Sequence, residues 1–459
     1  MSGLRPYQSD HANALLEILK SRGVAHDGSD CGTGKSYTGA WIAKKTGLET
    51  LVICPLSVVV TWRSILADFG VTATVINYES AHRRLGKLKP YGTGSFFAFD
   101  RVWPLTIYDE CHRVSGETTI NSKMMIASKR AGGRILTLSA TAADSVLKLK
   151  ALGFALGLHA LQDYKLWLIR HGAEAKPIYG RGGKQVLQKN GQPATKIEIG
   201  KRANTAAMGE IHNQIFGTGR RGSRMRIVDI PDFPQTQIEV RLLDGCSKEV
   251  TRLSEELQQF YAQRNVLAQF TEDELAKLVF WRQAAEVAKI PHFIEMTEDA
   301  LESSKVALFS NYNRTVDELV ADCEKRGWSC GVIRGEQKPS DRQHVITRFQ
   351  ANRLDVVVAN IQAGGVGVSL HDPVTKFPRT AIISPCWDAV GLKQAVGRVH
   401  RSGGGTSMQY LAYWSTGIEA RVASSVKRKI SNLDLLNDGE ISGFGEAPLV
   451  SKSSIETLL

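Results

Sequence analysis

The sequence predicts an α/β protein with two parallel-sheet lobes separated by a basic, partly helical insertion. Two observations support this prediction. Short apolar runs alternate with helical patterns in both halves of the chain, and a Gly-rich basic stretch interrupts the alternation near residue 160. Strands that alternate with helices form parallel sheets with helices on both faces. We expect the first lobe at 1–160, the insertion at 161–300, the second lobe at 301–434 and a tail at 435–459.

The first lobe is predicted from continuous apolar runs, which indicate buried strands, and from apolar residues at helical spacing. A Gly-rich turn at 27–36 follows the first helix. Ligand sites of this fold class occur in loops at the carboxyl ends of the strands. The predicted helices cover residues 12–20 and 37–45, and the predicted strands cover 50–59, 72–77, 105–109 and 134–140.

One segment of the insertion holds most of the chain's net positive charge. Residues 165–226 contain thirteen Lys and Arg, three Glu and no Asp, whereas the net charge of the whole chain is +12. A charged amphipathic pattern over 247–290 predicts two or three helices ended by Pro291. The second lobe is predicted from strands at 305–312, 330–335, 354–360 and 379–385 and from helices at 315–327, 340–350 and 391–402.

Composition narrows the class of protein. A chain of 459 residues is long enough for two or three domains. No apolar run reaches the roughly 18 to 20 residues that span a bilayer, and the N-terminus has no secretion signal. The seven scattered cysteines are typical of reduced thiols, so we expect a cytoplasmic protein of a bacterial cell or phage-infected host, or a nuclear one in a eukaryote. The positive charge favours an acidic polymer as partner.

Residues 29–36, SDCGTGKS, have the pattern of a phosphate-binding loop. Glycines let successive backbone N–H groups face phosphate oxygens, and the next helix adds its positive N-terminal end. Lys35 would reach the β and γ phosphates of ATP, and Ser36 would bind Mg²⁺. Ser29 stands where the strict pattern has its first glycine, which leaves a simple Gly-rich turn as the alternative. The expected nucleotide contacts are Gly32, Thr33, Gly34, Lys35 and Ser36.

A second polar cluster, Asp109, Glu110, Cys111 and His112, follows an apolar run. It is open to three interpretations: a metal site, a nucleophilic cysteine, or an acid pair that handles a metal-bound nucleotide. A metal site needs further ligands at suitable spacing, and a reactive thiolate needs a partner base. In a phosphate-loop enzyme, a carboxylate after a later strand completes the Mg²⁺ shell and an adjacent acid orients the attacking water. Asp109 and Glu110 supply both, and Cys111 is expected to be packing.

Five motifs in order resemble those of superfamily 2 helicases and translocases. The resemblance implies two RecA-like lobes that close on Mg·ATP and reopen after hydrolysis. We also expect His112 to sense the γ-phosphate and pass the signal toward Ser139 and Thr141. The motifs are GTGKS at 32–36, DECH at 109–112, SAT at 139–141, ANIQAGGVGVSL at 359–370 and QAVGRVHR at 394–401.

Further segments resemble the Swi/Snf-type branch of double-stranded DNA translocases. In that branch the first segment reads adenine, and the base-contacting place falls on Gln8. LSATA at 138–142 is instead similar to strand-separating helicases, and Gly404 replaces a glutamine of the branch. The resembling segments are LRPYQ at 4–8, VICPLSVVVTWRSIL at 52–66, GRRGSRMRIVDIPDFPQTQIEV at 219–240 and FWRQ at 280–283.

The second lobe is expected to stabilise the charge of the γ-phosphate in the transition state, where an inserted arginine is worth roughly 10³ to 10⁵ in rate. Arg398 and Arg401 are three apart on the predicted helix and would share one face. Gln394 would lie one turn earlier, near the nucleotide. The glycines of the GGVG turn, Gly367 among them, would bind phosphates of the track or close on ATP.

Nucleic-acid contacts are expected in loops after strands, where backbone N–H groups and hydroxyls bind phosphates without reading bases. The arginines of the insertion, Arg220 and Arg221 among them, are expected to bind a second arm of DNA, with a solvated loop as the alternative. The resemblance implies Pro55, Ser57, Trp62, Ser310, Asn311 and Tyr312 as residues that face the track.

The sequence thus predicts a DNA helicase or translocase that uses ATP and Mg²⁺ and works as a monomer on duplex, forked or branched DNA. The most specific form of this prediction is remodelling of forks or branched recombination intermediates by branch migration. Three alternatives stay open: translocation on duplex DNA without strand separation, an RNA helicase, and a nucleic-acid clamp that binds ATP with little turnover.

Overall fold

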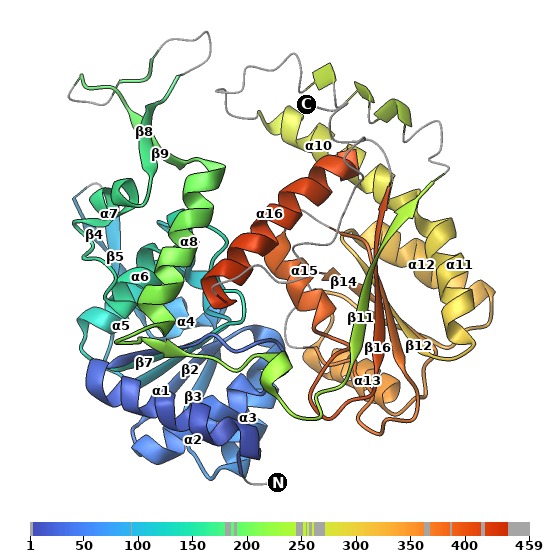
Figure 1. The fold of residues 1–459 in the computed structure, drawn as a ribbon, viewed down its shortest axis with the longest axis horizontal. Helices are drawn as coiled ribbons and strands as arrows, with labels where there is room; N and C mark the ends of the chain where they lie inside the picture. Colours follow the sequence, from blue (N-terminus) through green and yellow to red (C-terminus); the bar gives the residue numbers. More distant parts are fainter. Residues whose placement is uncertain are drawn as a thin grey trace. The chain divides into compact units, whose positions relative to one another are not determined.

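The computed structural model describes residues 3–92, 94–179, 185–187, 191–244, 251–253, 255–256, 259–260, 271–361, 368–385, 388–414 and 418–438. It divides into two compact units, each with a six-stranded sheet (Figure 1). One unit comprises Met1–Glu174, Glu198–Phe233 and Ser431–Ser442, and the other comprises Ala175–Ile197, Pro234–Ile430 and Gly443–Leu459. The predicted fold class, two parallel α/β lobes, is confirmed.

The first sheet has the order β10-β1-β7-β6-β2-β3, and every pairing is parallel. Strands β2 and β6 are buried along their whole length, as their continuous apolar sequences predict. The strands are β1 (Val24–Asp27), β2 (Thr50–Cys54), β3 (Ala73–Asn77), β6 (Leu105–Asp109), β7 (Arg134–Leu138) and β10 (Gly222–Ser223).

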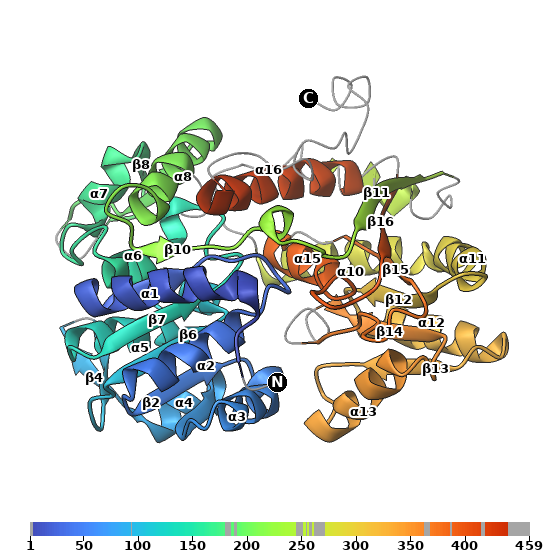
Figure 2. The same ribbon diagram turned by 60° about the horizontal axis from the view of Figure 1, so that its bottom comes forward.

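Helices cover both faces of this sheet (Figure 2). On one face, α1 (Ser9–Arg22), α2 (Lys35–Thr46) and α3 (Val59–Asp68) share one apolar core with the strands. The remaining elements before β11 are the helices α4 (Tyr78–Arg84), α5 (Ile120–Arg130), α6 (Lys150–Leu156), α7 (Tyr164–Arg170) and α8 (Lys201–Phe216), the antiparallel pair β4 (Gly86–Tyr91) and β5 (Gly94–Phe99), and the pair β8 (Ala173–Pro177) and β9 (Thr195–Ile199).

The second sheet has the order β11-β16-β15-β12-β14-β13, again all parallel. Its strands are β11 (Thr236–Leu243), β12 (Lys305–Ser310), β13 (Cys330–Ile333), β14 (Val356–Asn360), β15 (Arg379–Ile383) and β16 (Ser407–Trp414). The helices that follow in this half of the chain are α10 (Glu272–Val287), α11 (Ile290–Leu301), α12 (Asn313–Lys325), α13 (Pro339–Gln350), α15 (Ala389–Val396) and α16 (Ile418–Asp438). Side chains of α10, α11 and α12 form one core with the strands.

Three predicted element boundaries are wrong, each for a local reason. The strand predicted over 50–59 ends at Cys54, because Pro55 has no N–H for the ladder and the chain turns into a short 3₁₀ helix and α3. Pro291 does not end a helix but lies in the first turn of α11, where a missing N–H is tolerated. The helix predicted over 391–402 ends at Val396, before Gly397.

Residues of the predicted insertion enter both sheets, since β10 pairs with β1 and β11 pairs with β16. Of the predicted tail, 435–459, the structure describes only the residues up to 438, which end α16. No helix within the described ranges has the length and apolar character needed to cross a membrane.

Candidate active site

The predicted phosphate loop joins β1 to the N-terminus of α2. Gly32 and Gly34 have φ values of +86° and +92°, in the left-handed region that favours glycine. Lys35 begins α2, and its Nζ donates to two carbonyl oxygens of the same loop, those of Ser29 at 2.8 Å and Asp30 at 3.0 Å. The loop therefore has the backbone shape and the ammonium group that phosphate binding requires.

Gln8 packs directly against this loop. It is buried, and its Nε2 donates to the carbonyl oxygens of Thr33 at 2.9 Å and Gly34 at 3.3 Å. Its Oε1 accepts from the backbone N–H of Arg5 at 2.9 Å. A Cβ at Gly34 would lie 2.3 Å from Nε2, so a side chain there would displace the Gln8 amide. Gln8 holds the loop backbone in place, and the contact with adenine stays a prediction.

A buried polar network fastens the loop to the chain that follows β10. Ser29 Oγ accepts from the backbone N–H of Met225 at 2.9 Å and lies 3.2 Å from His11 Nε2. Asp27 accepts from Ser29 N at 3.0 Å, and its second oxygen lies 3.1 Å from the same His11 nitrogen. Burial by itself would raise the pKa of Asp27, but the neighbouring His11, Lys35 and the Ser29 N–H together lower it to about 2.

The backbone after β10 continues alongside the loop. Asp30 N donates to Met225 O at 3.0 Å, Asp30 Oδ2 accepts from Ile227 N at 2.8 Å, and Gly28 N donates to Ser223 O at 3.0 Å. Sequence reasoning missed this arrangement. In the sequence, the one sign of this contact was the serine in place of the first glycine. Its hydroxyl accepts the hydrogen bond from Met225 N.

The predicted acid pair lies at the carboxyl end of β6. Asp109 is buried, its Oδ2 accepts from Trp62 Nε1 at 2.7 Å, and its Oδ1 accepts from Glu110 N at 3.0 Å. Burial and then the charge of Glu110 raise the pKa of Asp109, while the Trp62 N–H and Lys35 oppose the shift. Glu110 has a φ of +52°, which is rare outside glycine and clusters at functional sites.

The predicted coupling residues form one chain that begins at Glu110. Glu110 Oε2 lies 3.3 Å from His112 Nδ1, and the same ring nitrogen lies 3.5 Å from Ser139 Oγ. Ser139 Oγ accepts from the backbone N–H of Thr141 at 3.1 Å. Ser139 and Thr141 are fully buried just after β7. The carboxylate at the end of β6 is thus connected to the segment that leaves β7.

Cys111 is buried next to the acid pair, in the 3₁₀ helix Cys111–Val114. Burial and the adjacent carboxylates raise the pKa of its thiol far above the ordinary value. Because its side chain is buried in the core, the prediction that Cys111 serves packing is confirmed.

The residues at this edge of the first sheet fit Mg·ATP. The glycine turn exposes backbone N–H groups, and Lys35 supplies a cation for the phosphates. Ser36 lies in the first turn of α2, and Asp109 is a buried carboxylate that forms no ion pair with any described residue. A hydroxyl and a carboxylate are oxygen ligands of the kind Mg²⁺ prefers.

The predicted arginine pair of the second unit lies beyond α15 and not on it. The expectation that both side chains share a helix face is therefore wrong. The turn nevertheless brings them to one carbonyl oxygen, that of Val368, with Arg398 Nη1 at 3.2 Å and Arg401 Nη2 at 3.5 Å. Gln394 is buried within α15. Gly367 lies outside the described residues.

Trp62 cannot face a nucleic-acid track, so this prediction is wrong. The residue is fully buried in the core of the first unit, and its indole N–H is bonded to Asp109. A Cβ at Gly39 would lie only 2.9 Å from the Trp62 ring, which shows how closely α2 packs on it. Of the other two residues predicted after β2, Pro55 is buried and Ser57 is partly exposed.

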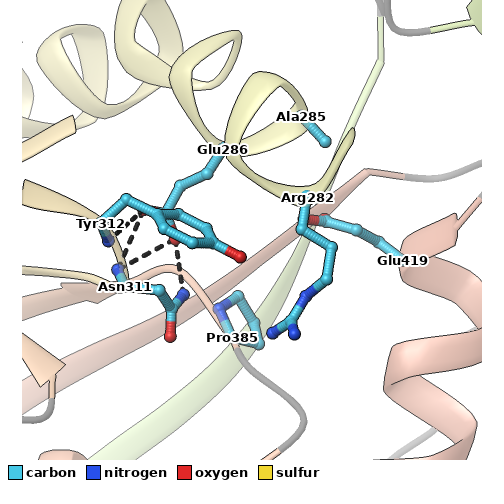
Figure 3. A pocket seen from close by; sticks show the side chains of 7 residues that line it. All are labelled: Arg282, Ala285, Glu286, Asn311, Tyr312, Pro385 and Glu419. Carbon is cyan, nitrogen blue, oxygen red and sulfur yellow. Dashed lines mark hydrogen bonds between the residues drawn. The ribbon is translucent and has the colours of Figure 1, made fainter. Parts of the chain in front are cut away.

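The corresponding loop of the second unit follows β12. Ser310 is fully buried, so its side chain does not face a track, and a contact through its backbone stays a prediction. Asn311 and Tyr312 are partly exposed, and both are held by the buried Glu286 of α10 (Figure 3). The Glu286 carboxylate accepts from Asn311 N at 2.9 Å and 3.0 Å, from Asn311 Nδ2, and from Tyr312 N at 3.1 Å.

The two predicted arginines of the basic segment differ in their surroundings. Arg220 is exposed. Arg221 donates through Nε to Leu156 O at 3.0 Å and through Nη1 to Gln214 O at 2.8 Å, and burial lowers its pKa. The side chain of Arg221 thus stabilises the first unit through hydrogen bonds to backbone carbonyls. A nucleic-acid contact of Arg220 stays a prediction.

Comparison with known proteins agrees with the fold and the ordered motifs. The family described as the helicase conserved C-terminal domain matches residues 288–403. The chain is also 28% identical over 468 residues to a protein of Acanthamoeba polyphaga mimivirus that is provisionally named an ATP-dependent RNA helicase. That similarity covers 96% of this chain and 84% of the viral protein.

Shorter similarities reach proteins named for DNA repair and recombination. The chain is 31% identical over 104 residues to RAD54B of Mus musculus and 27% identical over 130 residues to RAD54 of Saccharomyces cerevisiae. These matches cover 22% and 28% of this chain but only 11% and 14% of those proteins. Together with the two parallel α/β lobes, these similarities support a superfamily 2 helicase of the Swi/Snf-like branch and an ATP-hydrolysing enzyme.

Proposed function

We propose that this enzyme is a DNA motor that moves along duplex DNA and remodels forks or branched recombination intermediates, acting as a monomer. The observation that carries the proposal is the connected chain from Glu110 through His112 and Ser139 to Thr141. A protein that only binds ATP has no need to link its hydrolytic carboxylate to a neighbouring strand end. A motor needs such a link, because phosphate loss must alter the backbone.

The residues of the first unit have distinct roles in this proposal. Lys35 exchanges its two loop carbonyls for phosphate oxygens, and Ser36 with Asp109 would hold Mg²⁺, which neutralises phosphate charge when it is bound. Glu110 orients the attacking water and accepts its proton. Asp109 keeps its orientation because Trp62 holds one of its oxygens.

The second unit would supply positive charge toward the γ-phosphate. Arg398 and Arg401 both donate to the carbonyl oxygen of Val368, so the two guanidinium groups share one backbone contact. A single displacement of that turn would move both arginines together, which suits a switch that follows the nucleotide state.

DNA is proposed as the track on two grounds. The RAD54-type relatives are named for DNA repair and recombination. The chain also carries a net charge of +12, most of it in one segment, which favours a polyanionic partner. An RNA helicase is the second candidate, because the mimivirus relative with that name matches 96% of this chain.

A serine in place of the first glycine of the loop is the feature that would favour an ATP-binding clamp with little turnover. The hydroxyl is bonded to Met225 N and lies beside His11, so the serine supports the loop and leaves the glycine turn intact. This favours turnover over mere binding.

The test compares ATP hydrolysis and strand displacement on single-stranded, duplex, forked and four-way-junction DNA, with RNA alongside. We expect the strongest stimulation by forked or four-way DNA. Lys35→Ala and Glu110→Gln are expected to lower the stimulated rate by at least about 10²-fold while circular dichroism stays unchanged. Greater stimulation by RNA would replace the DNA proposal, and near wild-type turnover in either variant would reject the assigned roles.

A further inference from the structure

A pocket at the carboxyl edge of the second sheet contains a cation that has no partner within the described ranges. Its lining residues are Arg282, Ala285, Glu286, Asn311, Tyr312, Pro385 and Glu419 (Figure 3). Asn311 follows β12 and Pro385 follows β15, so both lie where loops of this fold class bind ligands. Among the described residues, Arg282 makes no hydrogen bond and no ion pair, although two carboxylates line the same pocket.

The first carboxylate, that of Glu286, forms hydrogen bonds with the loop after β12 and not with Arg282. Arg282 and Glu286 are four apart on α10, a spacing at which an arginine and a glutamate can form an ion pair. Glu286 instead turns its buried oxygens to the N–H groups of Asn311 and Tyr312. In Figure 3, the guanidinium of Arg282 extends beside Pro385, away from that carboxylate.

The second carboxylate is also compensated within the protein. Glu419 Oε1 lies 2.6 Å from Nζ of the fully buried Lys289, and Glu419 Oε2 accepts from Trp414 N at 2.7 Å. Lys289 Nζ also donates to Ala412 O at 2.9 Å. Because the oxygens of both carboxylates have other partners, neither is paired with Arg282, which is the cation that lines this pocket.

The size of the pocket limits what can enter. Its enclosed part has room for about one water-sized group. A single phosphate oxygen fits, with the rest of the strand outside. The loop beside it is fixed, because Glu286 holds Asn311 from one side and Asn360 Nδ2 donates to Asn311 O at 3.1 Å.

On the basis of the proposed function, we propose that Arg282 binds a backbone phosphate of the nucleic-acid track, beside Tyr312. Guanidinium groups bind phosphate oxygens through charge-assisted hydrogen bonds, and such contacts set the position of a protein on the strand without reading sequence. In this proposal, α10 contributes a residue to the surface of the second unit that contacts the nucleic acid. Arg282 is free to bind phosphate because Glu286 accepts hydrogen bonds from Asn311 and Tyr312 instead.

The test measures binding of the full chain, without nucleotide, to a fluorescent DNA duplex and to the matching RNA duplex over a range of salt concentrations. The variants are Arg282→Gln, Arg282→Lys and, as matched control, Arg353→Gln. Arg353 is exposed, whereas Arg282 is partly exposed, and Arg353 precedes β14, so it lies at the opposite edge of the same sheet. Thermal unfolding checks that each variant is folded.

We expect Arg282→Gln to weaken binding about tenfold at low salt and to reduce the slope of log K against log salt by about 0.9, the loss of one phosphate contact. Arg282→Lys should fall between Arg282→Gln and wild type, and Arg353→Gln should match wild type. Loss on RNA alone supports the same phosphate contact and identifies the polymer.

Three results would overturn the inference: wild-type affinity and slope in Arg282→Gln on both duplexes, an equal loss in Arg353→Gln, or weaker binding with an unchanged slope. A polyglutamate peptide serves as a further probe. If only its binding depends on Arg282, the pocket takes an acidic protein segment and the phosphate contact is rejected. Failure of the wild type to bind either duplex would instead reject the proposed function, independently of Arg282.

Discussion

Ser29 shows how one side chain can replace a motif residue without loss of the motif's shape. A glycine there would leave the buried N–H of Met225 without its acceptor, and an unsatisfied buried donor costs about 1 to 3 kcal/mol. The serine hydroxyl meets that donor and lies against His11, while the left-handed turns stay at Gly32 and Gly34. The departure from the sequence pattern is therefore a local structural requirement.

His26 makes the stability of the first unit depend on pH. It is buried on β1, and its Nδ1 lies 2.9 Å from Thr137 Oγ1, whose own proton goes to Ala25 O. Nδ1 therefore carries the proton of a neutral ring. Burial lowers the pKa of His26 from 6.5 to about 4, with Asp27 opposing and Lys35 reinforcing the shift.

Between pH 6.5 and 4 the unfolded chain binds a proton at His26 that the folded chain does not. Stability from this residue is thus complete above pH 6.5 and falls as the pH is lowered toward 4, by up to about 3 kcal/mol. Urea unfolding of wild type and His26→Gln at pH 7 and pH 4 measures it. We expect the loss on acidification to be smaller in the variant, and equal losses would contradict the assignment.

A glycine is required at Gly34 in the phosphate loop but not at Gly209 in α8. Gly34 has a φ of +92° and lies against Gln8, so an alanine there is strained and collides. Gly209 lies within α8 with open space at its Cβ position, so glycine at that site only adds freedom to the unfolded chain.

We expect Gly209→Ala to raise the free energy of unfolding by about 0.5 to 1 kcal/mol and to leave ATP binding unchanged. Gly34→Ala should weaken ATP binding at least about tenfold, because a strained φ and a displaced Gln8 distort the loop. Urea unfolding and titration with a fluorescent ATP analogue measure the two effects. Tight nucleotide binding by Gly34→Ala would show that the left-handed turn is dispensable.

The sequence predicted those elements whose pattern is local. β6 and β7 are continuous apolar runs because both faces of a parallel strand are buried, and their ends place Asp109 and Ser139 correctly. β10 pairs through only two residues, Gly222 and Ser223, and such a pairing leaves no periodic pattern. A sequence motif does not say whether a side chain is buried, so Trp62 was predicted on the surface. Arg282 was not predicted as a site residue, because its lack of an ion pair depends on the orientation of the Glu286 side chain.

Across the whole molecule, the excess of positive charge has to be divided between residues that hold the fold and residues left to bind a partner. Arg220 and Arg221 are adjacent in sequence but differ in this respect, since only Arg221 donates to the carbonyls of Leu156 and Gln214. Total charge therefore overstates the number of phosphate contacts.

We expect Arg220→Gln to leave unfolding unchanged and to reduce the salt slope of DNA binding by about 0.9. Arg221→Gln should instead lower the free energy of unfolding by about 1 to 3 kcal/mol, because it leaves two carbonyl oxygens without their donor. Urea unfolding and binding titrations across a salt series separate the two. A destabilised Arg220→Gln, or an Arg221→Gln that unfolds like wild type, would contradict this division.

The partnership of Ser29 with Met225 also has a consequence for biosynthesis. Ser29, the acceptor, and Met225, the donor, are 196 positions apart in the sequence. At ordinary rates of translation the ribosome therefore adds Met225 roughly 10 to 40 s after Ser29. During that interval the first five strands of the sheet exist, but β1 lacks its edge partner β10 and the loop lacks its anchor. The nascent chain therefore acquires its complete nucleotide site only after the basic segment has emerged.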